Sequence, residues 1–560
     1  MKIFHNHLGY NLNSAKKAII NSPNLPENLN FQIKSVSGET KYTGAITFSG
    51  KVDQWKDFNF HVLDFSSLCE EGLYYIEVNH DNKSVRSDKF KICANLIRNQ
   101  LLPDIATYFK AQRSSGRFDK TDYSIPFFGK RKGKRDVHGG WYDASGDMSK
   151  YLSHLSYANF MNPQHIPMSI WNFLESAENS KNETALKNRM IDEAVYGADF
   201  LVRMQDNSGY FYQTVFDGWS KDLTRRMICS YSTQKGILSE KYQAGFRQGG
   251  GTAIAALARV SALKETFGDY SSKTYYSAAE KGFLHLQKHN LRYLPNGEEN
   301  IIDDYCALLA ACELYRARNR KIWYEAAVKR TISLCGRLNQ IRNYTWWTAD
   351  NNKTRPFYHA ADAGLPVISL LRFYEIADDE TRDLIRNTVK NSLQSEMDVT
   401  SEVNNPFGYA RQVIKPLTGE IKSSFFIPHE NETGYWWQGE NARLASLSSA
   451  ALTAIKILGC PEIKDRLQAY AADQINWILG MNPFDICMIH GKGKNNPDYV
   501  DFLPNISGGI CNGITSGFKN ENDIDFLPTE CQNSYNETWR WSEQWIPHAS
   551  WMILAASLIE

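Results

Sequence analysis

The sequence lacks several features that mark common classes of protein. It has no run of about 18 apolar residues, the length that a membrane-spanning helix needs, so we expect no membrane partner. It has no G-x-x-x-x-G-K-[ST] loop, no H-E-x-x-H motif and no paired Cys/His spacing for zinc, so we predict no cofactor and no motif indicates a metal site. Its net charge is only +1, so we expect no nucleic-acid partner.

Signals for export are also missing. The first residues, MKIFHNHLGYNLNSAKKAII, contain neither the apolar run nor the small-residue cleavage site of a secretion signal. The ten cysteines are scattered from Cys69 to Cys531 without a C-x-x-C pair. Such cysteines in a large chain without a secretion signal are typical of reduced thiols, so we expect a cytoplasmic protein. No feature of the sequence indicates an oligomeric state.

Two regions with different patterns divide the 560 residues, which are too many for one ordinary core. Residues 1–95 hold short runs of β-branched and aromatic residues, such as FQIKSV and LYYIEV, separated by polar turns, and this pattern predicts a β-sandwich. From residue 96 on, apolar residues recur at helical spacing. Two kinds of helical segment alternate. Some are amphipathic, such as 183–205 and 321–339. The others are dense in small apolar residues, such as 249–263, 303–315, 360–371 and 442–455. The alternation favours two rings of helices, one inside the other, over 96–560; a long irregular helical array is the alternative.

Aromatic residues make up 13% of the chain, with 14 Trp and 29 Tyr. Rings in this number suit surfaces that stack against sugars or bases, although most of them are expected in the core. Many lie in long loops between the helical segments, such as 208–222, 342–362 and 429–443. Loops of this length are uncommon unless they are functional, so we expect them to wall a cleft at one end of the helices.

Two carboxylates stand in one glycine-rich stretch, HGGWYDASGDMSKYL, at residues 138–152. Gly139, Gly140 and Gly146 predict a tight turn rather than a helix, so that Asp143 and Asp147 point into one pocket. There they would hold one water, or one would raise the proton affinity of the other. The alternative is that both are solvent-facing turn residues.

A third carboxylate lies near the end of the chain, in SYNETWRWSEQWIPHASWMILAAS at residues 534–557. Glu537 stands where a polar, aromatic stretch leads into an apolar helix. One interpretation is a carboxylate that caps the helix N-terminus. The other is a general acid whose pKa is raised by the surrounding rings. A water-activating pair and a distant acid are the groups that inverting glycoside hydrolysis uses.

These segments resemble glycoside hydrolase family 9, in the subgroup with an N-terminal immunoglobulin-like domain. The resemblance covers nearly the whole chain. It is carried by NHLGYN, VLDFSSL and EGLYYIEV in the first region, and by GGWYDASGD, YHAADAGLPVISL, GYWWQGENARLASLSSAAL, LGMNPFD and YNE in the second. It implies an all-β immunoglobulin-like sandwich over residues 1–95, followed by an all-α (α/α)6 barrel as the catalytic domain over 96–560.

The resemblance also implies roles for the three carboxylates. Asp147 matches the catalytic base that activates water, Asp143 matches the carboxylate that helps to hold that water, and Glu537 matches the general acid. The family inverts configuration, which places acid and base roughly 6.5–9.5 Å apart. A catalytically inactive carbohydrate-binding protein is a further possibility, and the presence of all three carboxylates argues against it.

The sequence departs from the cellulose-cleaving members of the family at two places. Their first signature is Asp-Ala-Gly-Asp, whereas Ser145 lengthens it here. Their Pro-His-His-Arg segment is missing after Asn482 and Pro483, where this chain has a single His490. The missing segment argues against an endoglucanase and favours an exo-acting enzyme on short oligosaccharides. DASGD, together with GYWWQGENAR and DDYC, resembles the subgroup that includes bacterial exo-β-D-glucosaminidases, which release glucosamine from the non-reducing end of chitosan oligosaccharides. The alternatives are a β-glucosidase, a cellodextrinase or an endoglucanase acting on β-1,4-glucans.

An oligosaccharide is thus the expected partner, and an amino sugar needs a carboxylate beside its ammonium group. The candidates are Asp303, Asp304 and Glu440, each of which is alternatively an internal ion pair or a helix cap. The other predicted substrate-binding residues are Trp436 and Trp437, His359 and Tyr535.

Overall fold

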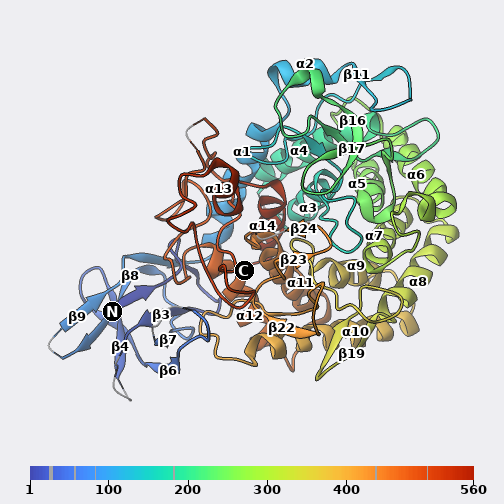
Figure 1. Ribbon diagram of the computed structural model, residues 1–560. Helices are drawn as coiled ribbons and strands as arrows, with labels where there is room; N and C mark the ends of the chain where they lie inside the picture. Colours follow the sequence, from blue (N-terminus) through green and yellow to red (C-terminus); the bar gives the residue numbers. More distant parts are fainter. Residues whose placement is uncertain are drawn as a thin grey trace.

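The computed structural model describes residues 1–560 apart from 24, 26–28, 56–58, 82, 181–182, 436–437, 501 and 560. A β domain, blue in Figure 1, lies beside a larger helical domain. The change from strands to helices falls between the end of β10 (Phe90–Cys93) and the start of α1 (Leu96–Gln112). No helix in the described part of the chain combines the length and apolar character needed to cross a membrane.

Two sheets form the β domain. Its other strands are β1 (Lys2–Phe4), β2 (Tyr10–Asn11), β3 (Lys17–Asn21), β4 (Asn30–Ser35), β5 (Thr40–Ala45), β6 (Thr47–Gly50), β7 (Phe60–Asp64), β8 (Gly72–His80) and β9 (Lys83–Arg86). One sheet has the order β1-β3-β7-β6, and the other has the order β2-β10-β8-β4-β5 with β9 paired to β8. Buried Phe31 and Ile33 of β4 join Ile20 and Leu63 of the other sheet in one core. The apolar faces of the two sheets therefore meet as in a β-sandwich.

Within the described chain, twelve helices form two concentric rings. The inner helices are α3 (Ile166–Asn179), α5 (Gly251–Ser261), α7 (Ile301–Ala317), α9 (Leu365–Tyr374), α11 (Asn441–Leu458) and α14 (Ile546–Leu558). Each packs on the next, and α14 packs on α3, so the ring closes. The outer helices are α1, α4 (Thr184–Arg203), α6 (Ser272–Tyr293), α8 (Lys321–Cys335), α10 (Asp379–Ser401) and α12 (Lys464–Ile478), and each packs mainly on one inner helix. The two-ring prediction is confirmed, and the architecture is an (α/α)6 barrel.

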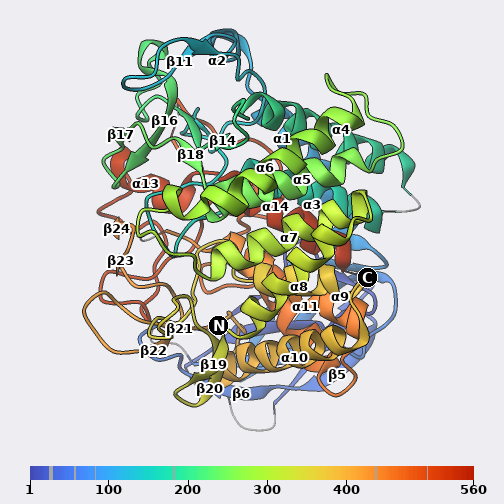
Figure 2. The ribbon, with the colours of Figure 1, turned by 90° about the vertical axis from the view of Figure 1, so that its right-hand side faces the viewer.

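Side-chain size explains which helices lie inside. Every residue of α5 is buried, and α7 is buried from Ile301 to Leu314. Both are rich in alanine and other small residues, which let helix backbones approach closely. The outer helices α6 and α10, which cross the front of the barrel in Figure 2, bury only one side and expose charged residues on the other.

Long connections at one end of the barrel carry short elements. These are α2 (Gly116–Asp122), α13 (Tyr535–Ser542), the single turns η1 (Leu223–Arg225) and η2 (Phe246–Gly250), and the strands β11 (Ile125–Pro126), β12 (Lys134–Arg135), β13 (Lys150–Tyr151), β14 (Phe211–Tyr212), β15 (Thr214–Phe216), β16 (Met227–Ser232), β17 (Ile237–Ser239), β18 (Gln243–Ala244), β19 (Leu338–Ile341), β20 (Tyr344–Trp347), β21 (Gln412–Ile414), β22 (Lys422–Ser424), β23 (Glu430–Asn431) and β24 (Gly434–Tyr435). Figure 2 shows β16, β17, α13, β23 and β24 along the left-hand side of the barrel.

Polar contacts fix the β domain to the barrel. His7 Nε2 and Lys2 Nζ each lie 2.8 Å from a carboxylate oxygen of Asp485. Asn6 donates a hydrogen bond of 2.8 Å from Nδ2 to Asn476 Oδ1 near the end of α12. The first strands are therefore tied to the segment that follows the barrel's last outer helix.

Candidate active site

The turn at residues 143–147 is a small closed loop. The amide of Ala144 donates to the carbonyl of Asp147, and the amide of Asp147 donates to the carbonyl of Ala144, both at 3.3 Å. Just before the turn, Gly139 and Gly140 have φ angles of 81° and 74°, a left-handed conformation that favours glycine. The glycines bend the chain so that two carboxylates face the same space.

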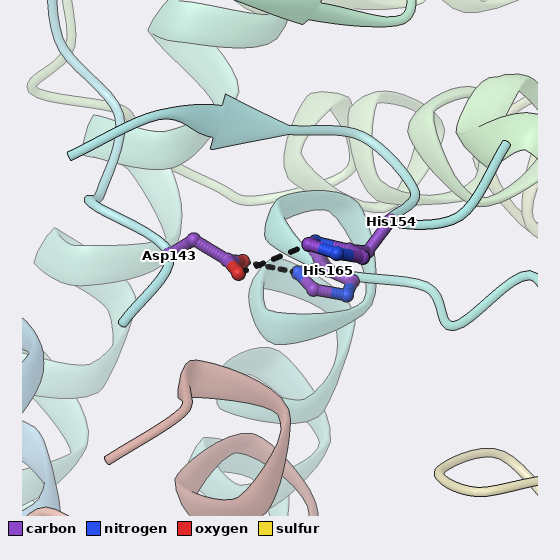
Figure 3. Close-up of side chains that lie close together, drawn as sticks. All are labelled: Asp143, His154 and His165. Carbon is purple, nitrogen blue, oxygen red and sulfur yellow. Dashed lines mark hydrogen bonds and ion pairs between the residues drawn. The ribbon is translucent and has the colours of Figure 1, made fainter. Parts of the chain in front are cut away.

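Asp143 is almost fully buried and is held by three rings. His165 donates a hydrogen bond from Nδ1 to Oδ1 of Asp143 (Figure 3), and Trp545 donates from Nε1 to Oδ2 at 3.0 Å. The Nδ1 atom of His154 lies 3.5 Å from the same Oδ2. Burial opposes ionisation of Asp143, but the charges and hydrogen bonds of the two histidines outweigh it and hold the pKa of Asp143 well below its ordinary value. The surroundings of Asp143 therefore favour its ionised form.

Asp147 is also buried but has a different set of neighbours. Its Oδ1 accepts a hydrogen bond of 2.8 Å from the amide of Ser149. Its Oδ2 accepts from the Tyr151 hydroxyl at 2.7 Å and from Trp219 Nε1 at 3.1 Å. Burial and the negative charge of Asp143 raise the pKa of Asp147, and the hydrogen bonds only partly offset this rise. Asp147 is thus a stronger base than an ordinary aspartate.

Glu543 reaches the same space from the other end of the chain. It follows α13 directly and precedes α14, and its carboxyl group lines one cavity together with Asp143 and Asp147. Burial of this group, followed by the charges of Asp147 and Asp143, raises the pKa of Glu543 well above its ordinary value. The surroundings of Glu543 therefore favour its protonated form.

Ser145 ties the aspartate turn to the segment of Glu543. The amide of Ser145 donates to the carbonyl of Gln544 at 2.9 Å, and the amide of Gln544 donates to Ser145 Oγ at 3.0 Å. The neighbouring Gly146 leaves room for this contact, because a side chain there would collide with Glu543 Oε1 and the ring of Tyr499. Ser145 thus holds the turn that carries Asp143 and Asp147 next to the segment that carries Glu543.

The cavity has a volume of about 360 Å³. Five aromatic residues and several neutral amide side chains surround the three carboxyl groups. Its lining residues are Asp143, Ala144, Gly146, Asp147, His154, Leu155, Trp219, Gln234, Gln438, Tyr499, Asn512, Tyr535, Asn536, Trp539, Glu543 and Trp545. Tyr499 and Tyr535 stack with their ring centres 6.2 Å apart. The arrangement can pair acid and base chemistry with flat apolar platforms.

Comparison with known families decides which family the chain belongs to. A family model described as "Glycosyl hydrolase family 9" matches residues 99–501, and one described as "Cellulase N-terminal ig-like domain" matches residues 1–83. The chain belongs to glycosyl hydrolase family 9. It is therefore an inverting glycoside hydrolase with an N-terminal immunoglobulin-like domain.

Similar proteins include enzymes with named substrates. The chain is 24% identical to the xyloglucan-specific endo-beta-1,4-glucanase BoGH9A of Bacteroides ovatus, over 95% of this chain and 89% of that protein. It is 29% identical to endoglucanase D of Acetivibrio thermocellus over 36% of this chain and 33% of that protein. Among solved structures, a Bacteroides ovatus family 9 protein matches with a TM-score of 0.66 and 20% identity over 99% of this chain and 98% of its own. A metagenome-derived family 9 endoglucanase matches with a TM-score of 0.66 and 15% identity, over the same shares of the two chains.

Glu537, the predicted acid of this family 9 chain, is not placed at the cavity. It lies in the first turn of α13, where its Oε2 accepts a hydrogen bond of 2.7 Å from Arg540 Nε, and its side chain is 41% exposed. Tyr535, Asn536 and Trp539 are the residues of α13 that line the cavity. Helical geometry turns position 537 away from the face that 535 and 539 share. Glu543, six residues later, occupies the place expected for Glu537.

The sequence around Glu543 holds a signal for an acid. Glu543 stands between Trp541 and Trp545 and three residues before the apolar α14 begins, so it has the low-polarity surroundings that an acid with a raised pKa needs. No local pattern marked His154 and His165, which meet Asp143 only through the tertiary fold.

The carboxylates predicted to bind an amino group also lie elsewhere. Asp303 is buried against Arg247, with Oδ2 3.1 Å from Nη1. Asp304 is buried between Arg330 Nη1 at 3.0 Å and Arg337 Nε at 2.6 Å. These ion pairs leave neither carboxylate at the cavity, so the internal ion-pair alternative is the one that the structure supports.

Glu440 and His359 are structural as well. Glu440 accepts hydrogen bonds from Arg443 Nε at 2.5 Å and from the amide of Ile427 at 2.8 Å. The ring of His359 is fully buried, and its Nδ1 accepts from the amide of Asp362 at 2.9 Å. Burial lowers the pKa of His359 to about 3, so it stays neutral. Trp436 and Trp437 lie outside the described residues, and Tyr535 is the predicted substrate-binding residue that lines the cavity.

Proposed function

We propose that this enzyme hydrolyses β-1,4-linked gluco-oligosaccharides, with Asp147 as the base, Asp143 as its partner in holding water, and Glu543 as the acid. The observation that carries the proposal is the convergence of these three carboxyl groups on one cavity lined by rings. Asp147 removes a proton from water while the water oxygen bonds to the anomeric carbon. Glu543 gives its proton to the glycosidic oxygen as the bond from that oxygen to the anomeric carbon breaks.

The pKa shifts of the three groups support these roles. The lowered pKa of Asp143 keeps it ionised, so it attracts the hydrogen atoms of the water. Its charge contributes to the raised pKa of Asp147, which strengthens the base. Both charges, together with burial, keep the proton on Glu543. Environments that separate the pKa values of neighbouring carboxyl groups are how such sites assign acid and base.

The lining of the cavity favours a neutral sugar. Gln234, Gln438 and Asn536 offer amide groups that both donate to and accept from hydroxyl groups. Lys221 Nζ lies 3.3 Å from the hydroxyl of Tyr535 at the edge of the cavity, and this positive charge repels a protonated amino sugar. The residues expected to receive the amino group, Asp303, Asp304 and Glu440, are engaged in ion pairs.

The named relatives agree with a glucan substrate, since one is named for xyloglucan and another as an endoglucanase. We therefore place β-1,4-glucans ahead of chitosan oligosaccharides, reversing the preference drawn from Ser145 and the missing Pro-His-His-Arg segment. The structure offers Ser145 another role, which is to join the aspartate turn to Gln544.

A matched pair of substrates tests the proposal. Kinetics with cellotetraose and with the glucosamine tetramer, at the same pH and ionic strength, give kcat/KM for two tetrasaccharides that differ only in the group at carbon 2 of each sugar. We expect faster hydrolysis of cellotetraose, with the α-anomer as the first product seen by NMR. Faster hydrolysis of the glucosamine tetramer would refute the substrate assignment without touching the catalytic roles. Full activity of Asp147→Asn would refute the roles themselves.

A further inference from the structure

We propose that Asp143, His154 and His165 form a binding site for a divalent transition-metal ion such as Zn²⁺, and that the bound ion inhibits the enzyme. The three residues come from separate parts of the chain: the aspartate turn, the segment after β13, and the residue directly before α3 (Figure 3). Each offers one ligand atom, and these atoms all lie within 4.8 Å of one another. Two imidazoles and a carboxylate with one open position are a ligand set typical of zinc.

The distance between His154 and Asp143 fits a metal ion better than it fits a direct hydrogen bond. Two ligand atoms about 2.1 Å from a tetrahedral Zn²⁺ are separated by about 3.4 Å. The distance between His154 Nδ1 and Asp143 Oδ2 is 3.5 Å, which is long for a hydrogen bond. His165 contacts Asp143 more closely through a shared proton, and a metal ion would take the place of that proton.

The weak contact of His154 leaves room for a ligand. Nδ1 of His154 is buried, and its approach of 3.5 Å to Asp143 Oδ2 is longer than an ordinary hydrogen bond. His154 lines the cavity, so an ion has a path to the site and a water molecule can supply a fourth ligand. Trp545 holds Oδ2 of Asp143 by a hydrogen bond of 3.0 Å, and such an outer contact orients a ligating carboxylate.

The charges around the cluster favour a cation. Asp147 lies beside Asp143, and its negative charge attracts an ion that would partly neutralise the pair. Inhibition follows because an ion on Asp143 withdraws this carboxylate from the catalytic water. This second step rests on the role proposed for Asp143, whereas metal binding itself does not.

Equilibrium dialysis against Zn²⁺ at neutral pH tests the site directly. His285 and His289, one turn apart on α6, are a second pair of neighbouring imidazoles that can hold Zn²⁺ at the surface. His289→Gln therefore serves as the reference chain. On this reference we expect one tight Zn²⁺ per chain, a loss of at least tenfold in affinity with His154→Gln, and retention of binding with His154→Cys, which supplies a thiolate ligand.

Two further measurements distinguish metal binding at this site from inhibition by the bound metal. Co²⁺ bound to the reference chain should show the visible absorption of a four-coordinate site, and His154→Gln should lose it, while circular dichroism establishes that both variants are folded. Zn²⁺ should inhibit hydrolysis with the same half-saturation as binding, and a chelator should restore activity. Zn²⁺ affinity within twofold of the reference in folded His154→Gln would overturn the site, whether or not Asp147 and Glu543 prove to be catalytic. Tight binding without inhibition would overturn the inhibitory role.

Discussion

Replacement of Glu543 by glutamine tests the assignment of the acid most directly. Burial and the charges of Asp147 and Asp143 raise the pKa of Glu543, which favours the protonated side chain that an acid needs. Glutamine has the same size and the same lack of charge, so it removes the transferable proton and little else. The hydrogen bonds and charges that set the pKa of Asp147 stay in place.

The expected loss follows from the contribution of general acid catalysis. This contribution is typically about 10²–10⁴-fold, equivalent to about 2.7–5.4 kcal/mol of transition-state stabilisation at 1.36 kcal/mol per decade. We expect kcat on cellotetraose to fall by this factor. The pH profile should lose the alkaline limb, which reports loss of the proton from Glu543, and keep the acidic limb, which reports protonation of Asp147.

The leaving group supplies an internal check. A 2,4-dinitrophenyl cellobioside departs without protonation, so its hydrolysis by Glu543→Gln should fall by less than tenfold. Glu537→Gln is the matched control, because it changes the neighbouring glutamate that pairs with Arg540. We expect this control to stay within threefold of the native rate on both substrates. A large loss in Glu537→Gln with little loss in Glu543→Gln would refute the assignment drawn from the fold.

Three further substitutions probe the surroundings of the site. Tyr151→Phe removes a hydrogen-bond donor that stabilises ionised Asp147, so the pKa of Asp147 should rise. The acidic limb of the pH profile should then move to higher pH. An unmoved limb would contradict Asp147 as the base. Ser145→Ala leaves the amide of Gln544 without its acceptor, which should cost about 1–3 kcal/mol and lower kcat, as thermal melting and initial rates will show; native values of both would contradict the linking role. Asp304→Ala breaks a buried ion pair and should cost about 3–5 kcal/mol while KM stays within twofold, whereas a raised KM at native stability would indicate substrate binding.

The barrel could be predicted from the sequence because the size and polarity of the side chains indicate whether a helix belongs to the inner or the outer ring. Segments such as 249–263, with small residues on all sides, became the fully buried α5, and the amphipathic 183–205 became the outer α4. The aspartate turn was predictable for a similar reason, since Gly139 and Gly140 take backbone angles that other residues avoid. In both cases the information is local.

The second half of the site could not be predicted in the same way. Glu537 and Glu543 are six residues apart, and which of them faces the cavity depends on where α13 begins and ends. Sequence patterns define helix boundaries only to within a few residues. Here a shift of that size decides whether Glu537 or Glu543 faces the cavity. Asp303 and Asp304 posed a related problem, because the arginines that pair with them lie 26 to 56 residues away in the chain.

The position of Glu543 explains why one additional residue in the aspartate turn has a structural consequence. In the proposed mechanism the turn contributes the base and the segment 543–545 contributes the acid, so the distance between them depends on how these two segments are joined. Ser145 makes that junction through its amide and its hydroxyl, both to Gln544, the residue next to the acid. Trp545, one position further on, donates to Asp143. The segment that carries Glu543 thus also orients Asp143. Through its contact with Gln544, Ser145 therefore affects the positions of both carboxyl groups.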